Sequence, residues 1–396
     1  MREALWITCL LALLMVCLLP AGALALPVLR RKLGRRGLGA FADTAAWRAA
    51  MERRAASLLR RMPLFPEEET FVYRLAARRR GVSRTKRSGR RAAKLLLAAG
   101  LYAEQNPVLF QAGKDYIAAL FTPNGEWAVP MEQAEDALLA YAVLSYPGTD
   151  LHLVRPAMDQ TARLLQALAG EADTIPAGRD HPALRLAQTL GAVCPFLAAY
   201  AAAYGEPFYL NLAMRQINEY LLNGMHPVQG IPAQGFDRNS GLPVGAFGWS
   251  GACAALAFGL METDRYLPEN DARKVRLQVH KRMLANRLRA MWAEDGSFPR
   301  LPAAQLPDSE AAAVLAAFLW DVCAKTQDQN GAGCIQNALN DLKSRTRLSG
   351  MVDFAQPESL HPGFYWDTSS PSSGALAAAL FAAERIKVWG ETLQAD

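Results

Sequence analysis

The stretch LGAVCPFLAAYAAAY, residues 190–204, places its large apolar side chains at the spacing of one buried helical face. Leu190, Val193, Leu197 and Tyr204 follow this spacing, because an α-helix turns once in about 3.6 residues. Most positions between them are alanine or glycine, which lets neighbouring helices approach closely. The same period recurs within 210–221, 315–322 and 376–386. The sequence therefore predicts an all-α chain with alanine-rich core helices.

Short turns rich in Gly, Pro and Asn separate the helical segments, for example at 122–125, 204–207 and 294–297. Short loops make successive helices antiparallel neighbours. From about residue 45 onward the apolar period fits roughly twelve or thirteen helices, and alternating β-branched runs are missing. We therefore expect no significant sheet. Six helical hairpins closed into a ring, an (α/α)6 barrel or six-hairpin toroid, are the expected fold for residues 95–396.

The N-terminal segment 1–29 contains an uncharged run from Ala4 to Leu29, long enough to cross a hydrocarbon core of about 30 Å. Small residues after Pro20 also resemble a signal-peptide cleavage site. Five Lys/Arg lie within residues 30–36, and positive charge beside a span tends to stay in the cytoplasm. We expect an uncleaved membrane anchor with a cytoplasmic body, and secretion after cleavage is the alternative.

Residues 30–94 form a basic region with 20 Lys/Arg against 5 Asp/Glu, whereas residues 95–396 carry a net charge of −9. Basic residues next to a membrane are attracted to anionic lipids. Nucleic acid is the alternative partner, but few aromatic residues lie among these charges and no nucleic-acid-binding motif is present. We therefore expect a helical juxtamembrane region and no nucleic-acid partner.

The six cysteines form no CxxC or Cys/His pattern typical of a zinc or redox site. The four in the body, at 194, 253, 323 and 334, are expected to be free and mostly buried. No metal ion is expected.

Two long irregular stretches, Gly224–Trp249 and Gly350–Ser373, interrupt the helical pattern. Long loops in a compact domain are usually functional or disordered. These contain several aromatic residues, which argues against disorder and suits the flat apolar faces of sugar rings. The alternative is that the aromatic side chains only cover the core.

Four further segments, 175–182, 188–197, 230–237 and 247–253, resemble the glycoside hydrolases of families 88 and 105, the unsaturated glucuronyl and rhamnogalacturonyl hydrolases. The resemblance extends in order over roughly residues 105–390. It implies the (α/α)6 barrel, a site at the mouth of the ring and no cofactor. The implied substrate is a short oligosaccharide that ends in a 4,5-unsaturated uronic acid.

In these families an inner-helix carboxylate protonates the enol-ether double bond and helps to deliver water. The resemblance places this acid/base group at Gln188, where an amide stands. An amide neither gives up nor takes a proton near neutral pH, so the usual chemistry is impaired. Asp136 is the position most readily identified as a remaining catalytic carboxylate, with Glu135 beside it in the substrate site. A solvated face or a capping role is the alternative for both.

The resemblance also assigns substrate contacts to Gln234, Phe236, Trp249 and Trp366. Gln234 stands where the families have a histidine, and Leu186 where they have a tryptophan. Trp249 occupies the position of an arginine that would hold the uronate carboxylate in two parallel hydrogen bonds. Three other aspartates are expected to cap loops and helices, namely Asp237, Asp308 and Asp367.

Two functions follow from these observations. The first is an active or altered hydrolase of unsaturated uronyl oligosaccharides. The second is a non-catalytic relative that keeps the ring for carbohydrate binding or as a scaffold at a membrane. Loss of the carboxylate at position 188 favours the second, and the shared fold favours the first by analogy alone.

Overall fold

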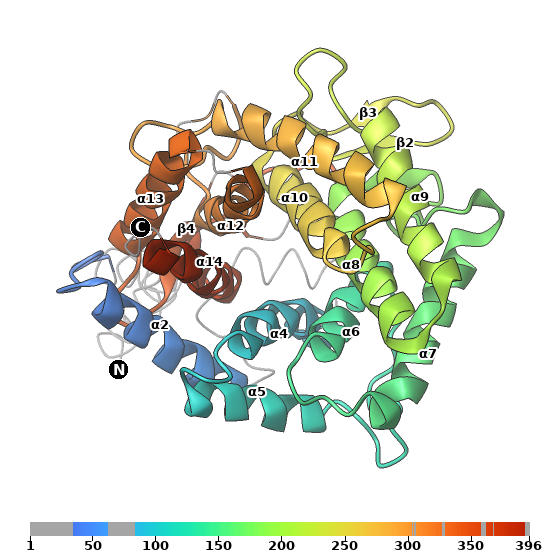
Figure 1. Cartoon of the computed structure of the whole chain (residues 1–396), viewed down its shortest axis with the longest axis horizontal. Coiled ribbons are helices and arrows are strands. Elements are labelled where there is room, and N and C mark those ends of the chain that lie inside the picture. Colours follow the sequence, from blue (N-terminus) through green and yellow to red (C-terminus); the bar gives the residue numbers. More distant parts are fainter. Residues whose placement is uncertain are drawn as a thin grey trace, which may run out of the picture.

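The computed structural model describes residues 35–61 and 84–392, apart from 303, 305, 327, 328, 358–361 and 367. Within this part of the chain, α-helices alternate between two concentric rings (Figure 1). The inner ring consists of α4 (Arg84–Gly100), α6 (Ala137–Leu144), α8 (Ala187–Tyr204), α10 (Ser250–Asp264), α12 (Ser309–Thr326) and α14 (Ser373–Thr392). The outer ring consists of α2 (Thr44–Leu59), α5 (Pro107–Ala118), α7 (Leu151–Ala169), α9 (Pro207–Asn223), α11 (Ala272–Arg289) and α13 (Gln329–Ser344).

Each inner helix packs against the next one along the chain, and α14 packs against α4, so the inner ring is closed. The predicted (α/α)6 barrel is confirmed. Helix α2 belongs to the outer ring and α4 to the inner ring. The barrel therefore includes part of residues 30–94, which the sequence suggested to be a separate juxtamembrane region. The expected N-terminal segment 1–29 lies outside the described residues. No helix in the described part of the chain has the length and apolar character needed to cross a membrane.

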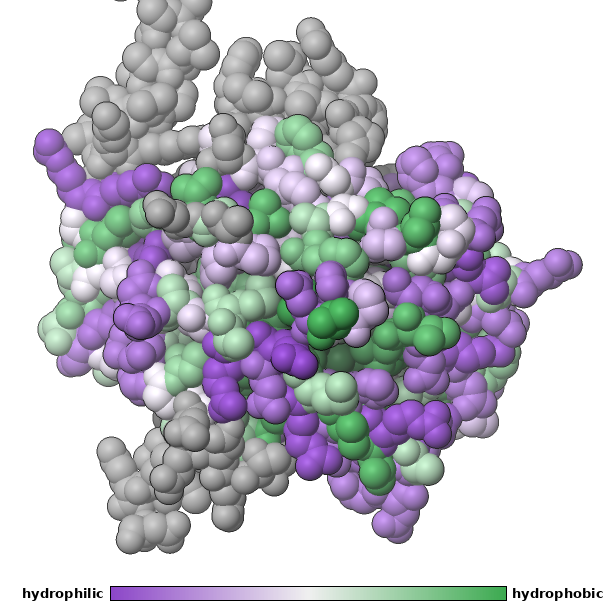
Figure 2. All heavy atoms as spheres, turned by 90° about the horizontal axis from the view of Figure 1, so that it is seen from above, coloured by the Kyte–Doolittle hydropathy of each residue, from purple (hydrophilic) through white to green (hydrophobic). Residues whose placement is uncertain are grey.

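The outer wall of the barrel is mainly hydrophilic, with hydrophobic residues scattered among the polar ones on the side shown in Figure 2. Several outer helices begin at a side chain that accepts backbone hydrogen bonds. These N-terminal caps are Asp43 for α2, Asn106 for α5, Asp150 for α7 and Asp271 for α11. A carboxylate or amide oxygen at this position satisfies an N–H group that the helix leaves without a partner.

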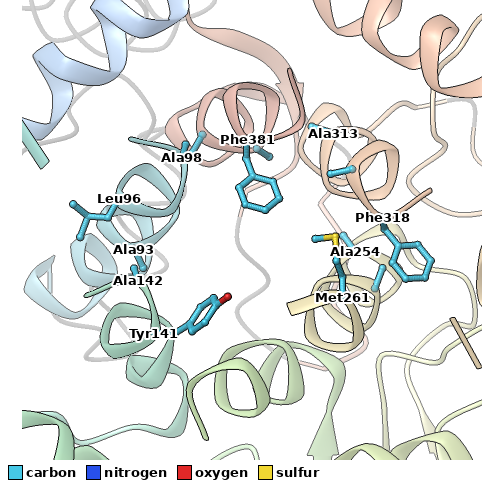
Figure 3. Packing of buried hydrophobic residues seen from close by; sticks show 14 of the residues in the cluster. Ala93, Leu96, Ala98, Tyr141, Ala142, Ala254, Met261, Ala313, Phe318 and Phe381 are labelled. Atoms are coloured by element: carbon cyan, nitrogen blue, oxygen red, sulfur yellow. The ribbon is translucent and has the colours of Figure 1, made fainter. Parts of the chain in front are cut away.

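The inner ring is packed through small residues, as the alanine-rich sequence predicts. Ala93, Ala142, Ala254 and Ala313 are buried on four different inner helices (Figure 3). Larger side chains extend toward the ring axis, among them Tyr141, Met261 and Phe381, which are all buried. The part of the barrel around these residues is therefore a packed core.

The connections before and after the inner helices differ in length. Loops that lead into an inner helix are long, such as 224–249 and 345–372, whereas those that leave one are short, such as 205–206. Alternating antiparallel helices make the inner helices parallel to one another. All of them therefore begin at the same end of the ring, called the N-terminal face below, and the long loops gather there.

Short paired strands connect these long loops to one another, although the sequence predicted no significant sheet. β1 (Leu184–Leu186), β2 (Gly235–Asp237) and β3 (Pro243–Val244) form one antiparallel sheet, and β4 (Val352–Ala355) pairs with β5 (Ser370–Ser372). Each strand has two to four residues, which is too short for an alternating pattern to be recognised in the sequence.

The four cysteines of the body are free thiols. Cys194, Cys253 and Cys323 are buried, and Cys334 is half-buried. This agrees with the predicted core role of these residues.

Candidate functional site

The residues expected to form the site lie on loops or first helical turns at the N-terminal face. Glu135 and Asp136 belong to a short 3₁₀ turn before α6, and Gln188 lies in the first turn of α8. Trp249 immediately precedes α10. The remaining expected residues lie in the loops before α10 and α14, and these are Gln234, Phe236 and Trp366. The residues that the sequence assigned to the site thus lie at one end of the barrel, and their role in a site stays a prediction.

A row of polar side chains crosses from α4 through Glu135 to α8. Arg90 donates from Nη2 to Glu135 Oε2 at 3.4 Å, and Thr189 donates from Oγ1 to Glu135 Oε1 at 3.1 Å. The Glu135 side chain is about seven-eighths buried, with 13% relative exposure. Glu135 is therefore a carboxylate held directly beside the residue that follows Gln188.

Gln188 itself is half-buried, and its Oε1 atom is buried without a hydrogen-bond partner in the structure. A buried amide oxygen without a partner costs free energy, on the order of 1–3 kcal/mol. Such a group is a ready acceptor for a hydroxyl or amide donor of a ligand.

Asp136 has the capping role that the sequence left open for it. Its Oδ2 atom accepts hydrogen bonds from the backbone N–H groups of Glu132 and Gln133, each at 3.0 Å. These bonds close the turn that leads into α6. Catalysis by Asp136 remains a prediction, and Glu135 is the neighbour whose carboxylate contacts α8.

Gln234 and Phe236 are both buried and lie in the long loop before α10. Gln234 Oε1 accepts from the backbone N–H of Gly363 at 2.7 Å and from the Tyr365 hydroxyl at 3.3 Å. The Phe236 ring packs edge-on against Tyr220 with ring centroids 5.9 Å apart. With only 1% of Phe236 exposed, this ring offers no open face to a sugar, and the core-covering alternative describes it better.

Trp249 belongs to a buried polar cluster that spans α10, α12 and β4. Its Nε1 donates to Gln356 Oε1 at 3.1 Å. Gln356 Nε2 and the Ser250 hydroxyl in turn donate to Asp308 Oδ2, both at 2.6 Å. Trp249 is 4% exposed, so its ring is largely buried. Its indole N–H holds Gln356 in place within the cluster.

Asp308 caps α12, as expected from the sequence. Its Oδ1 atom accepts from the backbone N–H groups of Glu310 at 3.2 Å and Ala311 at 3.4 Å. Burial raises the pKa of the Asp308 carboxyl and Glu310 adds to the rise, while the hydrogen bonds from Ser250 and Gln356 oppose it. Asp308 is thus a buried acid that holds its proton to a higher pH than an ordinary aspartate.

We expect Asp308→Asn to remove a pH dependence of stability. Because the pKa of Asp308 is raised on folding, the folded protein keeps this proton more tightly than the unfolded chain, whose aspartate pKa is about 3.9. The resulting contribution is complete below that value and is lost as the pH rises through the higher pKa of the folded protein. Urea unfolding over this range should show the variant gaining stability relative to the parent protein as pH rises. Parallel curves would mean that Asp308 titrates normally.

Trp366 is half-buried in the loop before α14. Its ring meets Phe364 edge-to-face with centroids 4.9 Å apart, and its carbonyl accepts a hydrogen bond from Arg300. Phe364 is exposed. The Phe364–Trp366 pair is therefore an aromatic surface at this face that is accessible to a sugar ring.

Four polar residues at this face were not identified from the sequence as parts of the site, namely Arg90, Lys94, Glu310 and Ser372. Lys94 Nζ lies 2.5 Å from Glu310 Oε1, which joins α4 to α12, and Ser372 Oγ donates to Glu310 Oε2 at 3.4 Å. Arg90 and Lys94 were attributed to a juxtamembrane basic region. The sequence contained one indication that they act together. Their four-residue spacing places both side chains on one side of a helix. Among the described residues, no cluster of three or more His, Cys, Asp or Glu has the arrangement of a metal site.

No protein-family model matches the sequence, and a search of curated proteins finds no match. Solved structures do resemble it. A possible member of family GH105 from Klebsiella pneumoniae subsp. pneumoniae MGH 78578 has a TM-score of 0.71 and 14% identity, over 88% of this chain and 95% of that chain. An unsaturated glucuronyl hydrolase specific for heparin has a TM-score of 0.68 and 13% identity, over 88% and 99%. A sugar epimerase from a ruminal bacterium has a TM-score of 0.54 and 11% identity, over 76% and 87%.

Identities this low establish the fold and leave the activity open, as the epimerase illustrates. Both rings of helices and the long loops at the N-terminal face agree with the resemblance noted in the sequence. The chain therefore has the six-hairpin barrel fold that is shared by the glycoside hydrolases of family 105 and the unsaturated glucuronyl hydrolases.

Proposed function

We propose that the N-terminal face of the barrel binds short oligosaccharides that end in a 4,5-unsaturated uronic acid, without hydrolysing them by the usual acid/base group. The observation that supports this most is the row Arg90–Glu135–Thr189 beside Gln188. The resemblance implies an arginine at position 249 and a carboxylate at position 188. The row instead has the guanidinium group of Arg90 near the amide of Gln188.

A uronate carboxylate needs a cationic partner, and Trp249 stands at the position where the resemblance implies an arginine. Arg90 is the candidate replacement, because its guanidinium lies at the same face and about a third of its side chain is exposed. Charge-assisted hydrogen bonds to a carboxylate contribute about 1.5–3 kcal/mol. Gln188 supports the same role, because an amide binds an anion without the repulsion that an aspartate would cause.

Hydrolysis by a displaced carboxylate is the second candidate function. Glu135 favours it, since its carboxylate contacts Thr189 and is therefore adjacent to the position of the missing acid. A carboxylate there would protonate the double bond only if its proton were available near neutral pH. Against this role, the Glu135 carboxylate is already engaged in an ion pair with Arg90 at 3.4 Å.

The test combines binding with loss of the double bond. The purified full chain is titrated with an unsaturated chondroitin or rhamnogalacturonan disaccharide by calorimetry, and the ultraviolet absorbance of the double bond is followed in parallel. We expect binding with constant absorbance. Arg90→Gln should weaken binding roughly tenfold to a hundredfold, because one charge-assisted bond is lost.

The control is Arg163→Gln, which removes an exposed arginine from the outer helix α7 and should leave the affinity unchanged. Absence of binding would reject the proposal. A falling absorbance that Glu135→Gln abolishes would establish the second function instead. The double variant Gln188→Asp with Trp249→Arg asks whether restoring both implied residues produces hydrolysis.

The location of the protein is part of the same proposal. The uncharged run from Ala4 to Leu29 and the basic residues after it support an uncleaved anchor with a cytoplasmic body. Secretion after cleavage is the alternative. Modification of a cysteine added after Asp396, in intact and in opened cells, distinguishes the two locations.

A further inference from the structure

Helix α11 of the outer ring has an unusual charge composition. Its 18 residues contain seven Lys/Arg and no Asp/Glu. The surrounding domain, residues 95–396, contains 22 Lys/Arg and 31 Asp/Glu. A helix of strongly positive charge is thus part of an otherwise acidic domain.

The exposed side of α11 also carries a line of apolar side chains. Val275, Val279 and Met283 are 59%, 42% and 61% exposed. Their four-residue spacing places them one above another along about 12 Å of helix. The helix is already anchored to the barrel by other residues, since Leu277, Leu284 and Leu288 are buried on its inner side. The exposed apolar line is therefore not needed for packing within the barrel.

Three arginines flank this line. Arg276, Arg282 and Arg287 are exposed, and no ion pair with a carboxylate is present for them within the described residues. Arg282 Nε donates only weakly, at 3.4 Å, to the carbonyl of Gln278 in its own helix. Lys281 is different, because it is buried and paired with Asp264 at 2.8 Å. The exposed charge of α11 is therefore available to an external anion.

We propose that the exposed side of α11 lies on an anionic lipid surface. The apolar line would enter the boundary between headgroups and acyl chains, and the flanking arginines would contact lipid phosphates, as in interfacial helices. Charge complementarity selects this partner, since each such arginine contributes about 1 kcal/mol near an anionic leaflet. A nucleic acid would be expected to meet aromatic side chains for stacking, and the exposed side of α11 has none.

This contact is independent of the sugar site and of the N-terminal run, so its test needs a local readout. A solvent-sensitive fluorescent amino acid replaces Val279 in the full chain. The protein is mixed with vesicles of phosphatidylcholine alone or with added phosphatidylglycerol, including brominated lipids as quenchers. We expect a blue shift and quenching only with phosphatidylglycerol, and loss of both at high salt.

Neutralising two arginines by Arg276→Gln and Arg282→Gln should shift the contact equilibrium about thirtyfold toward the detached state. The matched control places the same fluorophore at Leu222, an equally apolar and 80% exposed position on α9, where no response is expected. Equal responses at the two positions, or none at position 279, would overturn the proposal. In the latter case an acidic protein surface would become the partner to seek.

Discussion

Replacement of one buried carboxylate, Glu262→Gln, is expected to destabilise the barrel by about 3 kcal/mol. Glu262 accepts hydrogen bonds from Arg265 at 2.7 Å, from Arg385 at 3.0 Å and from the Tyr141 hydroxyl. These partners lie on or just after α10, on α14 and on α6, so one carboxylate joins three inner helices. The amide keeps the size of the side chain but leaves two guanidinium groups facing each other without an anion. Partial exposure of Arg265 places the cost at the lower end of the range for a buried pair.

The same residue gives a pH signature that separates charge from packing. Burial by itself raises the pKa of Glu262, but the guanidinium groups of Arg385 and Arg265 outweigh burial and hold the pKa below its usual value. The stabilisation is therefore complete above the pKa of an unfolded glutamate, about 4.3, and is lost as the pH falls through the lower folded value. Urea unfolding of Glu262→Gln should lack this acid-side loss.

Asp173→Asn provides the matched control for Glu262→Gln. Asp173 pairs with Arg215 at 2.7 Å, but both side chains are well exposed, so the pair contributes less than about 1 kcal/mol. An equal loss of stability in the two variants would contradict the role assigned to the buried network.

The apolar period was sufficient to predict the architecture, because it recurs along the chain in helices whose small residues are buried. The segment 187–204 is a clear example, with 14 of its 18 residues buried in α8. Helix α4 was harder to place, since its first turns are rich in Lys/Arg and resemble a membrane-proximal region. Tertiary packing of its second half, where Leu95 and Leu96 are fully buried, outweighs that composition.

The candidate site was only partly predictable for a different reason. The structure places Glu135 just before α6 and Gln188 in the first turn of α8, and such positions follow from loop lengths and helix starts, which are local features. The pairing of Arg90 with Glu135 joins residues 45 positions apart, and that of Lys94 with Glu310 joins residues 216 apart. Such pairs depend on how the ring closes. Side-chain exposure is equally non-local, which is why Phe236 could not be distinguished from a sugar-contacting aromatic residue.

The loop that carries Glu135 depends on one glycine, so Gly125→Ala is expected to destabilise the protein by about 3 kcal/mol. Pro156 lies inside α7 and has no N–H group to donate to the helical hydrogen bonds. The next residue, Ala157, donates its N–H to Gly125 O at 3.2 Å instead. Gly125 has a φ of +76°, and a Cβ atom there would overlap the Leu153 carbonyl oxygen. Neither backbone can move without breaking this contact between α7 and the loop.

Gly148→Ala isolates the part of this effect that comes from the backbone angle alone. Gly148 has the same φ of +76°, but a Cβ atom there meets no other atom within 4 Å. Its expected cost is the left-handed strain of about 1 kcal/mol, so thermal unfolding should rank Gly148→Ala well above Gly125→Ala in stability. Because the loop 119–136 leads directly to Glu135, Gly125→Ala should also weaken oligosaccharide binding, whereas Gly148→Ala should not. Equal effects of the two substitutions would mean that the contact between α7 and Gly125 does not position the loop.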